Sequence, residues 1–377
     1  MKSRNWVILL IVTAVLAGAA VWSVIDRNRQ LAERQYGEPL FPAMTGDAAN
    51  RVSELSVDTG HDAWTLQKQD GGQWVLAERN GYPADIDRVK EAVVALTNAR
   101  IVSPRTADPA KHARLDLEAP EAGLESESDV TSVRITARDG GGDTMADLLI
   151  GRVKALPTSR EAGQAYVRRM GEDQTWLVEG RFDIRKNPTA WLDKDLIKVK
   201  REEARDITIT RPGGETLELA RNRFSSLNVV GLAENRTEQD IRLTAAQRAL
   251  EFLPFKDVKP VAEVDFSDAI VTTYRIDDGT TVTVRTVEAG IEVDKDPGYW
   301  VSFDIAHDPE AATAEADMPE PGPNDEGKKR TVDVAAGAER AARAEARAEG
   351  WAYLFAEFTA QNFIHSLETV TEPKEDS

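Results

Sequence analysis

Residues 52–58, Val-Ser-Glu-Leu-Ser-Val-Asp, decide how this chain folds. Their apolar and polar side chains alternate, which is the pattern of a strand with one buried face. The same pattern returns in residues 206–210, Asp-Ile-Thr-Ile-Thr, and its Asp206 lies 152 residues after the corresponding Glu54. We therefore expect two strands of the same kind, in two similar parts of the chain.

Strand, turn and helix signals follow the first segment in a fixed order. Residues 64–68 and 74–76 predict two more strands, with a turn at Gly71-Gly72 between them. Asp85 then predicts a helix N-cap, and apolar residues at 3-4-3 spacing predict an amphipathic helix that ends near Asn98. Further strands are expected at 101–102, 133–137, 145–150, 165–170 and 176–179, and a short helix around 190–192.

The second part of the chain repeats this order at an offset of 151 to 156 residues. It has a strand signal at 216–218, a helix start at Asp240 and a proline at Pro260, and later strands are expected at 272–276, 282–287 and 299–303. Any two β-rich domains align loosely, but the preserved order of strands, capped helix, proline and strands favours duplication of one module. A solenoid would repeat every 20–50 residues or so.

These signals predict an α+β fold: an N-terminal transmembrane helix followed by two tandem β-rich modules of antiparallel sheets with a few short helices. The expected division is a membrane anchor (1–26), a tether (27–48), a first module (49–198) and a second module (199–373), which contains a disordered acidic insertion (308–333).

Residues 6–25 form a run of twenty residues without a charged side chain, which is the length that a helix needs to cross a bilayer. We expect an uncleaved signal-anchor in contact with membrane lipid, in a bacterial inner membrane, with the N-terminus cytoplasmic and the body periplasmic. A cleaved signal peptide is one alternative, with Ala17-Gly-Ala19 as its cleavage site, although the apolar run continues to Ile25. A buried soluble helix is the other, and it would need partners on every face.

Residues 308–333 are acidic, rich in alanine and contain four prolines. Such a segment buries too little apolar surface to offset its ordering entropy, so a disordered loop is expected. Residues 335–349 consist mostly of alanine, arginine and glutamate, which favours a helix. Because this helix lacks large apolar residues, we expect it to be solvated, and docking of a partner is the alternative.

The composition excludes several kinds of chemistry. The chain has 377 residues, a formal net charge of −18 and no cysteine. An acidic surface repels phosphate backbones, and no phosphate-binding loop occurs, so neither nucleic acid nor nucleotide is expected as a ligand. Disulfides, iron–sulfur clusters and thiol nucleophiles are excluded. The four histidines have no metal-binding spacing, and we expect neither a metal nor a cofactor.

The short acidic motifs fit turns and helix caps better than reactive sites. Residues 294–298, Asp-Lys-Asp-Pro-Gly, lack the ligands that a calcium loop needs. Residues 277–279, Asp-Asp-Gly, are expected as a hairpin turn, and residues 139–143 contain no phosphate-binding pattern. Asp85 and Asp87 suit the start of a helix. No nucleophile motif occurs, so the sequence indicates no catalytic, cofactor-binding or metal-binding residue.

Aromatic and imidazole side chains are also interpreted as structural. Five tryptophans lie in predicted strands and are expected in the core, with a carbohydrate-binding platform as the alternative: Trp64, Trp74, Trp176, Trp300 and Trp351. His61 and His112 lie in predicted loops and are expected to be solvated.

Motifs in residues 51–120 carry a family resemblance. They are an opening strand pair, Gly-Gln-Trp74-Val-Leu, Pro83-Ala-Asp85 and Asp108-Pro-Ala110. With them the chain resembles a widespread bacterial family of membrane-anchored proteins, the domain of unknown function 4340 family. The stretch from Trp351 to Leu367 is similar to that family's C-terminal part. The chain departs from the family pattern at Ala113-Arg-Leu115 and in its acidic insertion.

The resemblance implies a single N-terminal span, tandem β-rich modules and association with ABC transport systems of the gliding-motility type, as the extracytoplasmic component without ATPase activity. It implies no catalytic residues. We therefore expect a non-enzymatic accessory protein that binds an integral-membrane permease or an envelope protein. The alternatives are an envelope hydrolase or polymer-binding protein that uses acids such as Asp265, Asp268 or Asp294, and a structural envelope module.

Overall fold

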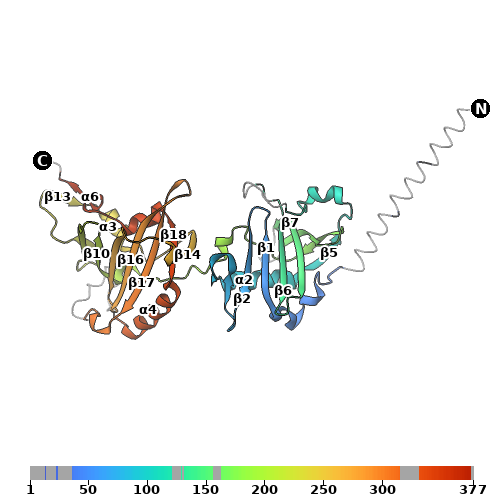
Figure 1. Cartoon of the computed structure of the whole chain (residues 1–377), viewed down its shortest axis with the longest axis horizontal. Helices are drawn as coiled ribbons and strands as arrows, with labels where there is room; N and C mark the ends of the chain where they lie inside the picture. The colour runs from blue at the N-terminus through green and yellow to red at the C-terminus, as the bar shows by residue number, and fades with distance from the viewer. Residues whose placement is uncertain are drawn as a thin grey trace, which may run out of the picture. The chain divides into compact units, whose positions relative to one another are not determined.

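The computed structural model describes residues 36–120, 131–155, 163–314 and 331–374, together with Thr13, Ser23 and Asp129. The chain divides into two compact units, Met1–Leu192 and Asp193–Ser377 (Figure 1). The boundary predicted between the modules, 198/199, lies six residues later in the chain.

The predicted membrane span at 6–25 lies outside the described residues, except for Thr13 and Ser23. In the described ranges, no helix has the length and apolar character that crossing a membrane requires. Residues 315–330 of the predicted acidic insertion also lie outside the described part.

A nine-stranded antiparallel sheet forms the first unit, in the order β4-β3-β2-β1-β6-β7-β8-β9-β5. The central β1 (Val52–Asp58) places Leu55 opposite Leu66 on one side and Ala137 on the other, and all three side chains are fully buried. The other strands are β2 (Ala63–Lys68), β3 (Trp74–Leu76), β4 (Tyr82–Pro83), β5 (Arg100–Pro104), β6 (Val133–Asp139), β7 (Thr144–Ala155), β8 (Gly163–Arg169) and β9 (Thr175–Glu179).

In the described part of this unit, one helix has an ordinary length, α2 (Ile86–Asn98). Its N-cap is Asp85, whose carboxylate accepts hydrogen bonds from the backbone N–H groups of Asp87 (3.0 Å) and Arg88 (3.2 Å). The buried side chains recur three to four residues apart, at Val89, Ala92 and Leu96 among others, so the amphipathic spacing buries one face. The predicted cap and helix are therefore confirmed.

An eight-stranded antiparallel sheet forms the second unit, in the order β12-β11-β10-β15-β16-β17-β18-β14. Its strands are β10 (Ala204–Thr210), β11 (Thr216–Arg221), β12 (Leu227–Val229), β14 (Asp257–Pro260), β15 (Ile270–Ile276), β16 (Thr280–Val293), β17 (Asp296–His307) and β18 (Trp351–Ala356). Its helices are α3 (Asp240–Gln247), α4 (Val334–Ala348), α5 (Glu357–Ala360) and α6 (Leu367–Val370).

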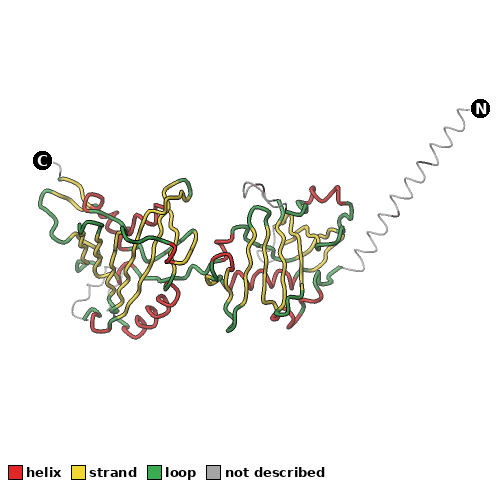
Figure 2. Tube along the Cα trace, viewed as in Figure 1, coloured by secondary structure: helices red, strands yellow, loops and turns green. Residues whose placement is uncertain are grey.

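The two sheets share one connectivity. β10, β11 and β12 take the places of β1, β2 and β3, β15–β18 take those of β6–β9, and β14 takes that of β5. The units differ at one edge, because β13 (Arg236–Glu238) pairs with β19 (Thr371–Pro373) instead of extending the sheet as β4 does. The predicted α+β class is confirmed: strands dominate each unit and the helices are few (Figure 2).

The prediction of a tether over 27–48 is wrong for its described part. The backbone from Gly37 to Leu40 runs along the outer edge of β5, and the Leu40 N–H donates to the Ala99 carbonyl (2.9 Å). Leu40 and Met44 are at most 1% exposed. Charge and proline content suggested a linker, but the free edge of β5 supplies hydrogen bonds and the core takes up the apolar side chains.

Two predictions around the acidic insertion also need correction. Asp308–Ala314 is not disordered, since it contains the turn η9 (Pro309–Ala311), and Thr313 is buried. The helix α4 is not merely solvated, because it packs along β17 and buries several of its small residues, among them Gly337 and Ala344. Small side chains allow a helix to approach a sheet closely, so α4 is buried on one face even though residues 335–349 contain no large apolar side chain.

A close backbone contact in the first unit yields a stability prediction. A Cβ on Gly151, in β7, would lie 2.3 Å from the Leu115 carbonyl oxygen and 2.5 Å from that of Asp116. We expect Gly151→Ala to lower the unfolding free energy by about 1–3 kcal/mol, because backbone must move to admit the methyl group. Gly140→Ala, where a Cβ meets nothing within 4 Å, is the control. Thermal unfolding that shifts equally little in both variants would refute the packing argument.

Candidate functional site

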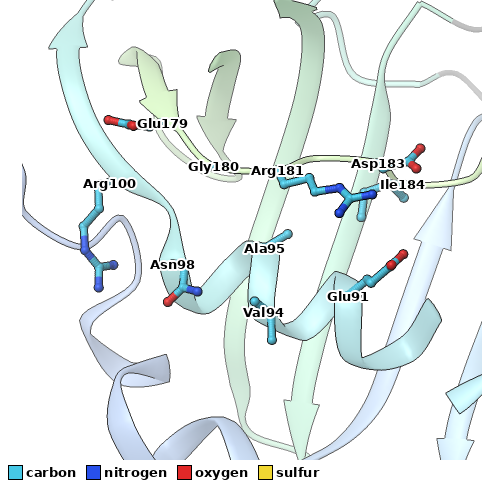
Figure 3. A pocket seen from close by; sticks show the side chains of 10 residues that line it. All are labelled: Glu91, Val94, Ala95, Asn98, Arg100, Glu179, Gly180, Arg181, Asp183 and Ile184. Atoms are coloured by element: carbon cyan, nitrogen blue, oxygen red, sulfur yellow. The ribbon is translucent and has the colours of Figure 1, made fainter. Parts of the chain in front are cut away.

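A cavity of about 520 Å³ opens in the first unit, between α2 and the chain that follows β9 (Figure 3). We call it the α2 groove. It is lined by Glu91, Val94, Ala95, Asn98, Arg100, Glu179, Gly180, Arg181, Asp183 and Ile184.

The α2 wall of the groove follows from helix periodicity. Positions 91, 94, 95 and 98 lie three to four residues apart and therefore share one face of α2. The Asp85 cap holds the start of this helix. Arg100 closes its other end, because its guanidinium donates to the carbonyls of Thr97 (3.0 Å) and Ala99 (3.3 Å).

Hydrogen bonds to other segments of the chain hold the opposite wall in place. Gly180 donates its N–H to the Gly163 carbonyl (3.0 Å), which ties the end of β9 to the start of β8. Further along, the Trp191 indole N–H donates to the Arg185 carbonyl (3.1 Å). The Asp85 N–H in turn donates to the Trp191 carbonyl (2.7 Å), so both walls belong to one hydrogen-bonded frame.

Exposed apolar surface forms the floor of the groove. Val94 is 53% exposed, although its neighbour Ala95 is buried, and Ile184 on the opposite wall is half-buried. A large apolar side chain exposed within a concave surface is a feature of binding sites.

The charges around this floor differ in how they are paired. Glu91 accepts a hydrogen bond from Arg88 (3.3 Å) and Asp183 one from Arg185 (3.0 Å). Arg181 and Glu179 have no side-chain partner among the described residues. Figure 3 shows the Arg181 guanidinium on the side of the groove where Asp183 and Glu91 lie.

This lining is suited to binding. Its ten residues include three carboxylates and two arginines, but no histidine, serine, threonine or lysine. An apolar floor flanked by the charges of Arg181 and Glu179 can hold an extended peptide segment, whose apolar side chain covers Val94 while its polar groups meet these two charges.

The structure places the sequence motifs mostly where turns and caps were expected. Asp139 accepts hydrogen bonds from the N–H groups of Gly141 (3.0 Å) and Asp143 (3.1 Å), as a turn requires. Asp294 has φ +56° in the turn between β16 and β17, and its carboxylate pairs with Lys256 (2.7 Å). Both interpretations as turns are confirmed.

The acids considered for hydrolysis do not line the α2 groove. The Asp265 carboxylate accepts a hydrogen bond from the Ser267 N–H (2.9 Å), which lowers the pKa of Asp265. A general acid would need a raised pKa. In the described ranges, no group of three or more metal-ligating side chains is found.

One prediction about histidine is wrong. His112 is 6% exposed, and its Nε2 lies 2.9 Å from the Asp173 carbonyl oxygen. The loop that carries it packs against the sheet at Gly151. The tryptophans predicted in the core lie in strands, and four of them are less than 10% exposed: Trp64, Trp74, Trp176 and Trp300.

Residues 277–279 form the expected hairpin turn, but they are also the centre of a buried polar cluster that the sequence did not indicate. Asp277 and Asp278 are 4% and 7% exposed. The Arg221 guanidinium donates two hydrogen bonds of 2.7 Å to the Asp277 carboxylate. Arg340 of α4 donates to Asp278 (2.8 Å).

This cluster joins both flanks of the acidic insertion to the sheet. Near the start of the insertion, the Thr313 hydroxyl donates to Asp277 (2.8 Å). After it, Arg340 reaches both Asp278 and Glu203 (2.7 Å). The partners are 36 and 62 residues from these two aspartates, so no local pattern could reveal the arrangement. We assign the cluster a structural role.

Comparison with known proteins gives one match. No curated protein and no solved structure matches this chain significantly. The family described as a domain of unknown function, DUF4340, matches residues 74–263, just over half of the chain. The match runs from β3 of the first unit to the turn after β14 of the second. The chain therefore belongs to the DUF4340 family.

Proposed function

We propose that this protein is a non-enzymatic, membrane-tethered accessory subunit of a transport or envelope complex, and that the α2 groove binds its partner. The observation that carries the proposal is the groove itself, which is lined by exposed Val94 and by the unpaired charges of Arg181 and Glu179 within a hydrogen-bonded frame. Surfaces of this kind suit recognition of a protein segment.

The partner class follows from where the first unit sits in the chain. Only residues 26–35 separate the predicted span at 6–25 from Tyr36, where the continuously described chain begins. Ten extended residues reach at most about 35 Å. The groove would therefore work close to the periplasmic membrane surface, where an integral-membrane permease or an envelope protein is within reach. The predicted span and the family resemblance support an ABC-type permease as the first candidate.

A photo-crosslinking amino acid at position 94 tests this proposal. We expect it to capture a membrane protein of permease type in intact cells, because Val94 is 53% exposed on the groove floor. The matched control is position 230 in the second unit, where Val230 is 52% exposed outside the groove. Arg181→Glu should weaken the adduct at position 94. No adduct there, together with recovery of the chain alone in gentle detergent, would contradict the proposal.

The proposed location can be tested with the same cells. The chain has no native cysteine, so Phe358→Cys, at a position 85% exposed, adds a single thiol. A membrane-impermeant maleimide should label it in spheroplasts without lysis. Labelling that appears only after lysis would place the body in the cytoplasm instead.

A further inference from the structure

Two basic side chains surround one tyrosine on the sheet of the first unit. The Lys154 ammonium, on β7, lies 4.8 Å from the centre of the Tyr166 ring on β8. The guanidinium carbon of Arg105, which directly follows β5, lies 5.7 Å from the same centre. Both distances fall within the range in which an aromatic face attracts a cation, about 6 Å. We call these three residues the Tyr166 cluster.

The Tyr166 cluster places two positive charges close together on this sheet. Elsewhere on it, Arg134 pairs with Asp147 (2.7 Å) and Arg138 with Glu54 (2.5 Å). Neither Lys154 nor Arg105 has a carboxylate partner in the part of the chain that the structure describes. Two like charges held close together repel each other. The chain is acidic, with a net charge of −18, and yet none of its described acidic side chains neutralises these two cations.

The surroundings of the tyrosine hydroxyl favour negative charge. A hydrogen bond from Lys154 is the largest cause that lowers the pKa of Tyr166, and the charges of Lys154, Arg105 and Arg152 lower it further. Arg152 is itself paired with Asp116 (3.1 Å), so the surplus comes from the other two cations.

The cluster extends from the end of the edge strand β5 to β7, three strands further into the sheet. Pro39 bridges Arg100 in the antiparallel sense. Tyr36 is therefore directed toward the C-terminal end of β5, which Arg105 follows. Ten residues, 26–35, separate Tyr36 from the predicted span at 6–25, so this end of β5 is within reach of a bilayer surface.

We propose that Lys154, Arg105 and Tyr166 bind a phosphate group, presented by an anionic lipid headgroup at the membrane surface. Two cations neutralise the phosphate, and the tyrosine ring suits the boundary between apolar and aqueous phases. The inference rests on the proposed membrane tether. It adds a second contact, which would hold the first unit against the bilayer in one orientation.

The full chain in lipid nanodiscs tests this inference. Gln164, opposite Lys154 in the β7–β8 register, is changed to cysteine and labelled with a fluorophore, because the chain has no other thiol. Quenching by a quencher attached to lipid headgroups is compared between discs of phosphatidylcholine and discs that also contain phosphatidylglycerol. A second arm adds glycerol phosphate to the phosphatidylcholine discs and follows the shift of the fluorophore emission.

We expect the anionic discs to increase the ratio of quenched to unquenched molecules. Lys154→Gln and Arg105→Gln should each lower that ratio about fivefold, the contribution of one basic residue at an anionic surface. The control is Arg223→Gln in the second unit, which removes a cation lying 4.6 Å from the Phe224 ring centre and should leave the ratio unchanged.

The outcomes are distinguishable. A response to anionic discs that both variants reduce supports the lipid headgroup as the source of the phosphate. A response to glycerol phosphate alone supports the phosphate site but overturns the lipid source. No response in either arm overturns the inference. If the full chain does not associate with phosphatidylcholine discs at all, the membrane anchor is refuted. That result concerns the anchor and not the Tyr166 cluster.

Discussion

An Arg221→Met variant should lose about 3–5 kcal/mol of unfolding free energy in the second unit. The Arg221 side chain is 3% exposed, and that of its partner Asp277 is 5% exposed. Both terminal nitrogens of Arg221 donate to the carboxylate at 2.7 Å. Methionine fills much of the space but leaves the Asp277 carboxylate buried without the Arg221 cation, and the hydrogen bond from the Thr313 hydroxyl does not neutralise its charge.

A matched exposed pair separates this effect from a general loss of charge. Arg285 and Asp304 are 3.9 Å apart with side chains 43% and 62% exposed, so Arg285→Met should cost at most about 1 kcal/mol. Adding Asp277→Leu to Arg221→Met should recover much of the loss, because no unpaired charge then remains. Urea unfolding monitored by hydrogen exchange in β15 and β16 reports on this unit alone. Equal losses in the two single variants would contradict the argument.

Acidification should destabilise the second unit through His365. This residue is 4% exposed, and its Nε2 has no hydrogen-bond partner in the described part of the chain. Burial lowers the pKa of His365 from 6.5 to about 4, with smaller contributions from Arg242 and Arg211. The unfolded chain therefore binds a proton at a higher pH than the folded chain does, and stability falls as the pH decreases.

The expected loss develops between pH 6.5 and pH 4 and amounts to about 3 kcal/mol, at about 1.4 kcal/mol per pH unit of pKa difference. His365→Leu removes the titrating group, so its stability should decrease less over the same interval. Urea midpoints measured at pH 7, 5.5 and 4.5 for the two chains provide the test. Parallel pH profiles of the wild type and His365→Leu would show that this histidine does not control the acid sensitivity.

Local patterns predicted the repeated elements well, for a clear physical reason. The alternation around Leu55 reports which face of a strand is buried, and Asp85 needs only the next three residues to cap its helix. Each signal acts over a few residues and survives in any tertiary context that buries the same face. The same connectivity then recurs in both sheets because the order of these signals recurs.

The candidate sites depended on contacts between distant residues and were not predicted. Val94 and Arg181 line the same groove, and Arg105 and Lys154 lie against the same tyrosine ring, although none of these residues belongs to a recognisable motif. Exposed arginines and lysines are common in any soluble domain. Only their grouping in space distinguishes them, and that grouping depends on how the strands pair.

By itself, the sequence determined two antiparallel α+β units, their strands and the capped helix, because hydrophobic periodicity and capping are local. Tertiary structure alone decided that residues 37–40 complete the edge of β5, that the small residues of α4 pack on β17, and that Arg221 and Arg340 neutralise the buried turn at 277–279. These outcomes depend on which backbone edge is free and which charge lies opposite, and such conditions exist only once the sheet has formed.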